Sequence, residues 1–178
     1  MQPTKILVSW LEANANRGLF SLQDLRGLFP DLSQPAFKTL LSRAQHAGHI
    51  ERICRGIYLY RKSSTQQDGR LLFRVATLLR SHQFNYISLE TVLSDAGFIS
   101  QIPMNRITIM SSGRSNTISC YKAGTIEFIH TKRSPLEIMN DLTYDPHTQM
   151  WRASTDLAIR DMKLTRRNLD LVKSSRIA

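Results

Sequence analysis

Apolar residues recur at helical spacing in two short segments near the start of the chain. Residues 5–15 carry apolar side chains at intervals of three and four residues, which predicts a first helix. These side chains are Ile6, Leu7, Trp10 and Leu11. Residues 21–28 predict a second helix, because Ser21 precedes Asp24 at the spacing of a capping box.

A third predicted helix follows a turn at Phe29-Pro30-Asp31 and has the clearest division into two faces. Ser33 is expected to cap its first turn, where Pro35 is tolerated, and Gly48 is expected to end it. Its apolar positions follow the i, i+3, i+4, i+7 pattern: Phe37, Leu40, Leu41 and Ala44. We expect this face to pack on the first two helices.

Two short β-prone runs come next, at residues 49–54 and 57–60. The two residues between them, Arg55-Gly56, fit a hairpin turn, since glycine adopts positive φ without strain. The order helix, turn, helix and hairpin predicts a winged helix-turn-helix DNA-binding domain over residues 1–62. Residues 63–69 are polar and are expected to form a linker.

Residues 70–178 mix helical and strand patterns, so we expect a small mixed α/β C-terminal domain in a chain of α+β class. Helices are expected at residues 70–82, 88–96, 135–142, 153–163 and 167–173. Strands are expected at residues 106–110, 117–121 and 125–130, and a loop at residues 143–149. Ser88 is expected to cap the helix that it precedes.

The charge of the chain changes this picture, because it points to a partner. Lys and Arg number 24 against 14 Asp and Glu, a net charge of +10. Residues 1–62 hold nine basic against four acidic side chains, residues 63–150 eight against seven, and residues 151–178 seven against three. Basic chains attract polyanions, so we expect nucleic acid to bind, and the two basic ends to supply the contacts.

Cysteine usage and hydropathy indicate the compartment. Cys54 and Cys120 both fall in predicted strands with no neighbouring cysteine, which favours reduced, packed thiols. The apolar run at residues 6–11 is too short to span a bilayer, and no signal peptide is visible. We therefore expect a cytoplasmic protein that makes no membrane contact.

The third helix and the hairpin supply the candidate DNA contacts. Hydrogen-bonding and cationic side chains suit base edges and phosphates in a major groove. On the third helix these are Ser33, Gln34, Lys38, Thr39, Ser42, Arg43 and His46. On the hairpin they are Arg52, Arg55, Arg61 and Lys62, which we expect to gather near one tip.

Catalytic patterns are weak. Asp161-x-Lys163 has the spacing of part of a nuclease motif, but it lies on a predicted helix without a second carboxylate to hold a metal ion. His46-x-x-His49 has a metal-ligand spacing, but Gly48 ends the helix before His49. We find no phosphate loop or dinucleotide turn, and we expect neither a cofactor nor an enzyme activity.

Several segments carry a family resemblance. In the first domain it lies in GHIERICRGIY (residues 48–58), a wing pattern of glycine, arginine, glycine and tyrosine. In the second domain it lies in YISLETVL (86–93), GFI (97–99), IP (102–103), ITI (107–109), GTIEF (124–128) and ASTDLAIRD (153–161). Through these segments the chain resembles the AbiEi antitoxins of bacterial abortive-infection (type IV) toxin–antitoxin systems. Asp156 stands where that family usually has glutamate.

The resemblance implies two roles. The winged domain would bind double-stranded DNA at inverted repeats in its own promoter and repress a toxin–antitoxin operon. The second domain would act against a nucleotidyltransferase toxin, in the classical description without a stable toxin complex.

Two other readings stay open. The chain could be a winged-helix transcriptional regulator whose C-terminal domain senses a ligand or dimerises, with no toxin partner. It could also be a nucleic-acid-processing enzyme, which requires a metal-binding carboxylate cluster that the sequence does not show.

Overall fold

The computed structural model describes residues 2–64, 69–99 and 105–172, and it divides the chain into two compact units. The first unit is Met1–Leu71 and the second is Leu72–Ala178. Both units combine helices with a β-sheet, so the chain is of mixed α+β class. Residues 65–68, most of the expected linker, lie outside the described residues.

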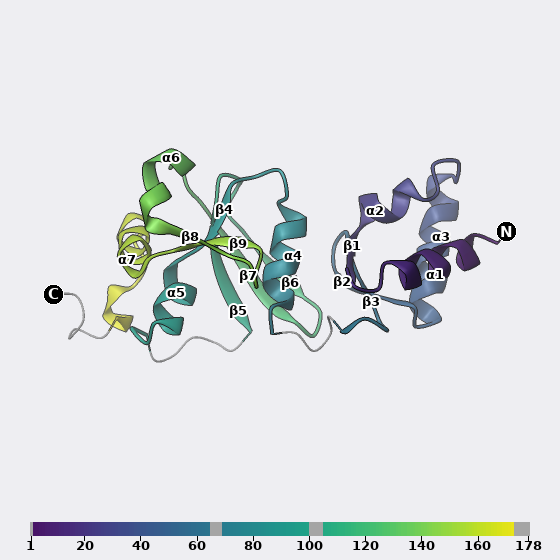
Figure 1. The fold of residues 1–178 in the computed structure, drawn as a ribbon, viewed down its shortest axis with the longest axis horizontal. Helices are drawn as coiled ribbons and strands as arrows, with labels where there is room; N and C mark the ends of the chain where they lie inside the picture. Colours follow the sequence, from purple (N-terminus) through teal and green to yellow (C-terminus); the bar gives the residue numbers. More distant parts are fainter. Residues whose placement is uncertain (1, 65–68, 100–104, 173–178) are drawn as a thin grey trace. The chain divides into compact units, whose positions relative to one another are not determined.

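Within its described residues, the N-terminal unit contains the helices α1, α2 and α3 and a three-stranded antiparallel sheet of order β1-β3-β2 (Figure 1). Its elements in chain order are α1 (Pro3–Ala13), β1 (Leu19–Ser21), α2 (Leu22–Gly27), α3 (Gln34–His46), β2 (Ile50–Cys54) and β3 (Ile57–Tyr60). The three helices and the hairpin agree with the sequence pattern. Strand β1 was not expected, because its three residues form a strand only through their pairing with β3.

Local capping chemistry sets the helix boundaries. The backbone N–H of Asp24 donates to the Ser21 hydroxyl, and the Asp24 carboxylate accepts from the Ser21 backbone at 2.8 Å, so the predicted capping box is confirmed. Ser33 accepts from the N–H of Ala36 at 3.3 Å and caps α3. Gly48 follows α3 with φ +75°, a conformation that side-chain-bearing residues rarely adopt.

The core of this unit lies between the three helices and the sheet. The apolar positions that the sequence assigned to the inner face of α3 are all buried: Phe37, Leu40, Leu41 and Ala44. They pack in one cluster with Leu7, Leu11, Phe20, Leu25, Phe29, Ile50, Tyr58 and Tyr60. Burial of each large side chain contributes about 2 kcal/mol, so this contact fixes which side of α3 faces outward.

The C-terminal unit is built on a six-stranded mixed sheet of order β6-β7-β5-β4-β9-β8. Its helices are α4 (Leu71–Leu79), α5 (Leu89–Asp95), α6 (Pro135–Ile138) and α7 (Thr155–Leu164), with 3₁₀ turns η2 (Met139–Asp141) and η3 (Leu169–Leu171). Its strands are β4 (Asn85–Ile87), β5 (Arg106–Ser111), β6 (Asn116–Cys120), β7 (Gly124–His130), β8 (Leu142–Asp145) and β9 (Met150–Ala153). The β5–β7 and β4–β9 pairs are parallel.

Helices cover both faces of this sheet. Side chains three residues apart on a strand point to opposite faces of the sheet. On β5, the Thr108 hydroxyl bonds to Thr91 of α5. Three residues later, the Ser111 hydroxyl accepts from Arg80, which follows α4. Arg80 also lies over the Phe128 ring, 3.9 Å from its centroid. Helices α5 and α7 therefore share one face and α4 takes the other (Figure 1).

Three expectations for this unit are wrong. The helix expected at residues 135–142 ends after Ile138, and Leu142 begins strand β8. The loop expected at residues 143–149 instead contains most of β8, which pairs with β9. The helix expected at residues 167–173 is only the 3₁₀ turn η3 within the described residues. In the first two cases the pairing of β8 with β9 overrode the local helix and loop patterns.

The remaining sequence expectations concern the cysteines and the membrane. Cys54 and Cys120 are both buried and neither forms a disulfide. Across the described residues, every helix is too short or too polar to cross a bilayer.

We predict opposite effects for two alanine substitutions at the ends of helices. Gly48→Ala should lower the free energy of unfolding of the N-terminal unit by about 1 kcal/mol, because φ +75° is strained for alanine. Gly27→Ala should raise it by about 0.5–1 kcal/mol, because that glycine is helical and has open space around it. Urea unfolding followed by Trp10 fluorescence in a Trp151→Phe background measures both changes. Equal changes in the free energy of unfolding at the two sites would contradict the assignment of a positive φ to Gly48 and a helical conformation to Gly27.

Candidate nucleic-acid interface

The outward face of α3 is a continuous arc of polar side chains. At 100° per residue, five positions span about 140° of the helix surface, opposite the buried apolar positions. They are Lys38, Thr39, Ser42, Arg43 and His46, and all five are exposed. Every α3 contact predicted from the sequence therefore faces away from the core, together with Ser33 and Gln34 at its start.

The side chains on this arc keep hydrogen-bonding capacity for a ligand. Within the described residues, neither Lys38 nor Arg43 has an ion-pair partner. Thr39 donates to the carbonyl of Pro35 at 3.0 Å, which leaves its lone pairs open. His46 Nδ1 lies 2.7 Å from the carbonyl of Ser42, which can only accept, so Nδ1 is the donor of this contact and Nε2 is not used in it.

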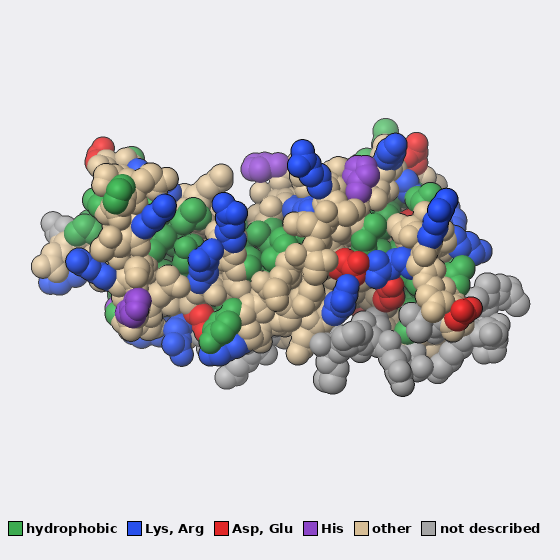
Figure 2. Space-filling model, turned by 180° about the vertical axis from the view of Figure 1, so that it is seen from behind, with side chains coloured by type: hydrophobic (Ala, Val, Ile, Leu, Met, Phe, Trp, Pro, Cys, Tyr) green, Lys and Arg blue, Asp and Glu red, His purple; other side chains and the backbone are tan. Residues whose placement is uncertain are grey.

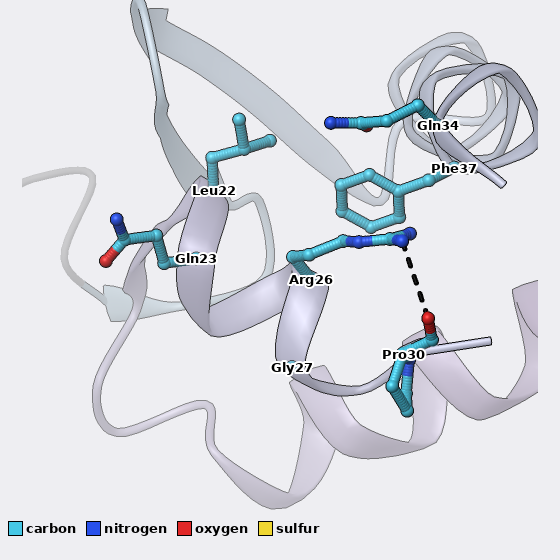
Figure 3. Close-up of a pocket in the computed structure, with 7 residues that line it drawn as sticks. All are labelled: Leu22, Gln23, Arg26, Gly27, Pro30, Gln34 and Phe37. Atoms are coloured by element: carbon cyan, nitrogen blue, oxygen red, sulfur yellow. Dashed lines mark hydrogen bonds between the residues drawn. The ribbon is translucent and has the colours of Figure 1, made fainter. Parts of the chain in front are cut away.

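Arg26 fixes the turn between α2 and α3. Its guanidinium donates to the carbonyl of Leu32 at 2.6 Å and lies 5.1 Å from the centroid of the Phe37 ring. Figure 3 shows Arg26 and Gln34 on opposite sides of this ring. Beside them is a largely apolar hollow of about 520 Å³, with Gln23 and Gln34 among the residues that line it. Two amide side chains therefore flank the start of α3.

The tip of the β2–β3 hairpin carries one predicted cation. Arg55 is exposed next to Gly56, whose φ of +83° forms the turn. The carbonyl of Gly56 accepts from the N–H of Leu22 at 2.7 Å, so the tip is tied to the first residue of α2. Arg52 is exposed on β2, where the strand register shifts between Arg52 and Cys54.

The expectation that four cations gather at this tip is wrong. Ile50 pairs with Tyr60 at the open end of the hairpin, and Arg61 donates its N–H to the carbonyl of His49 there. Arg61 and Lys62 are exposed, but they lie at the opposite end from Arg55, about 13 Å away at 3.3 Å per residue. Lys62 is also 3.9 Å from the Glu12 carboxylate of α1.

The acidic residue Asp24 lies on α2 of this basic unit, and its charge is compensated locally. Figure 2 shows Lys and Arg side chains spread over the visible face of the N-terminal unit, at the left of that view. Asp24 bonds to Arg17 at 2.9 Å and to Ser21, so its charge is compensated. Burial tends to raise the pKa of Asp24, but these hydrogen bonds outweigh it and hold the pKa below its ordinary value.

Sequence reasoning missed Arg26 and Gln23 at this site. Arg26 sits on the second predicted helix, four residues before Pro30, and that spacing places its side chain over the turn. The sequence shows a cation just before a turn, which is a common arrangement. Its role becomes evident only from its contacts with Leu32 and Phe37.

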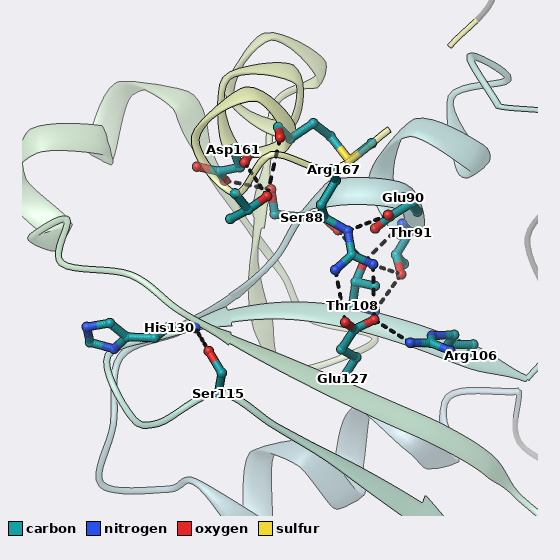
Figure 4. Close-up of polar contacts among 12 residues, drawn as sticks. Ser88, Glu90, Thr91, Arg106, Thr108, Ser115, Glu127, His130, Asp161 and Arg167 are labelled. Atoms are coloured by element: carbon teal, nitrogen blue, oxygen red, sulfur yellow. Dashed lines mark hydrogen bonds and ion pairs between the residues drawn. The ribbon is translucent and has the colours of Figure 1, made fainter. Parts of the chain in front are cut away.

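A second cluster of polar residues is buried in the C-terminal unit, around Asp161 of α7. Asp161 is fully buried and accepts a hydrogen bond from Ser88 at 2.7 Å (Figure 4). The same carboxylate oxygen accepts from the Tyr86 hydroxyl at 3.0 Å. Its other oxygen lies 3.6 Å from Arg133, too far for a hydrogen bond. These partners favour the charged form of Asp161, but burial outweighs them and raises its pKa above the ordinary value. The Ser88 hydroxyl therefore bonds to α7 and makes no capping hydrogen bond to α5. The expectation that the Ser88 side chain caps α5 is wrong.

An ion-pair network lies on the same face of the sheet. Arg167 bonds to Glu127 at 2.9 and 3.1 Å and to Glu90 at 2.5 Å, and Arg106 bonds to Glu127 at 2.6 Å (Figure 4). Hydrogen bonding to Arg167 holds the pKa of Glu127 below its ordinary value. Burial opposes the charge on Arg167, but the two carboxylates outweigh it and raise the pKa of Arg167.

These clusters do not form the catalytic arrangements considered from the sequence. Asp161 lies on α7 with its carboxylate bonded inside the unit, while Lys163 is exposed. Within the described part of the chain, no three His, Cys, Asp or Glu side chains lie close enough to share a metal ion. The arrangement is suited to holding α5 and α7 on the sheet.

Comparison with known proteins leaves the family open. The chain matches no protein-family model, and no curated protein is significantly similar to it. The resemblance to AbiEi antitoxins therefore stays a prediction.

We predict opposite pH responses from Asp161 and Glu127. The pKa of Asp161 is raised above 3.8 in the folded state, so its contribution to stability is lost as pH rises from 3.8 through the raised value. The pKa of Glu127 is lowered below 4.5, so its contribution is lost as pH falls from 4.5 through the lowered value.

Neutral variants separate the two effects. Asp161→Asn should flatten the stability profile above pH 3.8, and Glu127→Gln should flatten it below pH 4.5. Urea unfolding followed by Trp151 fluorescence in a Trp10→Phe background measures the C-terminal unit. A Glu127→Gln profile that matches the parent protein below pH 4.5 would refute the role given to Arg167.

Proposed function

We propose that the N-terminal unit is a winged helix-turn-helix domain that binds double-stranded DNA. Helix α3 would lie in the major groove, and the β2–β3 hairpin would contact the adjacent backbone through Arg55. The element order α1, β1, α2, α3, β2, β3 supports this proposal. The charge of +10 supplies the attraction to phosphates.

One observation carries most of the proposal. The four apolar residues of α3 are buried, while all seven of its predicted contact residues are exposed. A helix held by one apolar face can insert the other into a groove without losing its packing. Lys38 and Arg43 are suited to guanine edges or phosphates, and Ser42 and Thr39 to either.

The proposal extends to a repressor that regulates its own operon and acts as an antitoxin against a nucleotidyltransferase toxin. Its support is the resemblance, together with the contacts among the resembling segments. Tyr86 and Ser88 of the YISLETVL segment bond to Asp161 of the ASTDLAIRD segment. Glu90 and Glu127, from two of these segments, share Arg167. The segments therefore act together as one structural unit.

We predict that Lys38→Ala and Arg43→Ala each weaken binding to the operator by about tenfold, because each removes one direct contact. The operator is first located by footprinting the DNA upstream of the chain's own gene, and affinities are then measured by fluorescence anisotropy at fixed salt. Lys5→Ala is the matched control, since Lys5 is exposed on α1 of the same unit. Unchanged affinity in both α3 variants, with the fold intact, would reject the interface.

The antitoxin role needs its own test. If a nucleotidyltransferase gene adjoins this gene, co-expression of the chain should restore growth to cells that express that enzyme. The Lys38→Ala variant should rescue equally well, because neutralisation is assigned to the C-terminal unit. Failure of the intact chain to rescue would favour a regulator without a toxin partner.

A further inference from the structure

Strand β8 is an edge of the six-stranded sheet and pairs on one side only, with β9. Alternate backbone N–H and C=O groups of an edge strand point away from the sheet, where another chain can pair with them. Proteins commonly use such edges to bind an extended segment as an added strand. The surroundings of β8 decide whether this edge suits a partner.

Two aromatic side chains are exposed beside this edge. Tyr144 of β8 and Trp151 of β9 are directly paired across the strands, with ring centroids 5.4 Å apart. They are 49% and 41% exposed. Exposed tyrosine and tryptophan are enriched in protein–protein interfaces, where they act as anchors.

A small hollow opens next to the aromatic pair. Its volume is about 220 Å³. Phe84, Tyr144, Met150 and Trp151 supply the apolar part of its lining, and polar side chains such as Gln83, Asn85 and Gln149 supply the rest. Sites for drug-sized ligands commonly measure ~300–1,000 Å³, so this hollow is better matched to one side chain of a partner, whose apolar part would meet the two aromatic rings.

The sequence segment that contains β8 is acidic, whereas the chain as a whole is basic. Residues 134–151 contain no Lys or Arg, although the chain is at +10. Their acidic residues are Glu137, Asp141 and Asp145, and Arg160 forms an ion pair with Asp141. Burial slightly opposes ionisation of Asp145, but hydrogen bonds from His147 and Thr148 outweigh it and hold its pKa below the ordinary value.

Exposed apolar residues continue into the segment that leads to β8. Leu136 of α6 is 81% exposed and Met139 of η2 is 54% exposed. Turn η2 runs directly into Leu142, the first residue of β8. Exposed apolar groups and the carboxylates of Glu137 and Asp145 therefore occur together along this part of the chain.

We propose that β8, Tyr144, Trp151 and Asp145 form a docking surface for another protein. The occupant is an extended segment that adds as a strand to β8, places an apolar side chain against Tyr144 and Trp151 in the hollow and sets Lys or Arg beside Asp145. We call this the β8 surface. The proposal is independent of DNA binding by the N-terminal unit.

Charge argues against two other occupants. A nucleic acid would bring phosphates toward Asp145, whose carboxylate repels them. A second copy of the chain, pairing β8 with β8, would place two acidic strands side by side, each with the Asp145 carboxylate at its end, and like charges across strands are destabilising. An extended segment with basic and apolar side chains is repelled in neither of these ways.

The test uses the full chain and a short synthetic peptide that alternates lysine with valine or phenylalanine. In a Trp10→Phe background, Trp151 is the only tryptophan, so its emission reports binding at the β8 surface. We expect the lysine peptide to shift this emission. A peptide with glutamate in place of lysine should bind about tenfold more weakly, because its charges repel Asp145.

Two controls test strand addition and the aromatic anchor. The same lysine peptide with alternate amides N-methylated keeps its charge but cannot pair as a strand, and it should bind about tenfold more weakly. Tyr144→Ser should weaken binding about threefold to tenfold through loss of an aromatic contact. Tyr121→Ser should not, since Tyr121 is 57% exposed after strand β6 at the other edge of the sheet.

The outcomes separate the occupants. Equal binding of the N-methylated peptide, or no response to the lysine peptide, would overturn the proposal. A matching emission shift with a DNA oligonucleotide would assign the surface to nucleic acid instead. A dimer in sedimentation that Tyr144→Ser abolishes would assign it to a second copy. Chemical shifts of the Tyr144 amide in the unsubstituted protein supply the same readout if Trp10→Phe disturbs the fold.

Discussion

Burial of one side of α3 is the constraint on which the N-terminal unit depends. Phe37, Leu40, Leu41 and Ala44 fix the rotation of this helix against α1 and the sheet. Once that rotation is set, Lys38 and Arg43 must face outward, and Arg26 holds the turn that leads into the helix. The proposed DNA contacts are thus a consequence of core packing, and they need no rearrangement of the fold.

The two units differ in how much of them could be predicted from sequence. In the N-terminal unit, caps and apolar spacing act over a few residues, so Ser21, Ser33 and Gly48 mark boundaries that the structure confirms. In the C-terminal unit, β9 exists because it pairs with β4, some 65 residues earlier. Local patterns cannot report such pairings, and strand β9 was therefore missed.

The candidate site shows the same division. Exposure of the α3 residues followed from periodicity, whereas the distribution of cations on the hairpin depended on strand register. Sequence proximity suggested one cluster of four, but pairing of Ile50 with Tyr60 places Arg61 and Lys62 at the open end. The role of Ser88 was also missed, because its partner Asp161 lies 73 residues away.

The proposal for the N-terminal unit requires that the outward face of α3 and the hairpin tip contact the same DNA duplex. Amide chemical shifts of the ¹⁵N-labelled chain, recorded as its own upstream duplex is added, test this most directly. The account predicts that the shifted amides cluster at residues 33–46 and 52–56, with little change at Arg61 and Lys62. Shifts confined to the C-terminal unit, or spread over the buried face of α3, would contradict it.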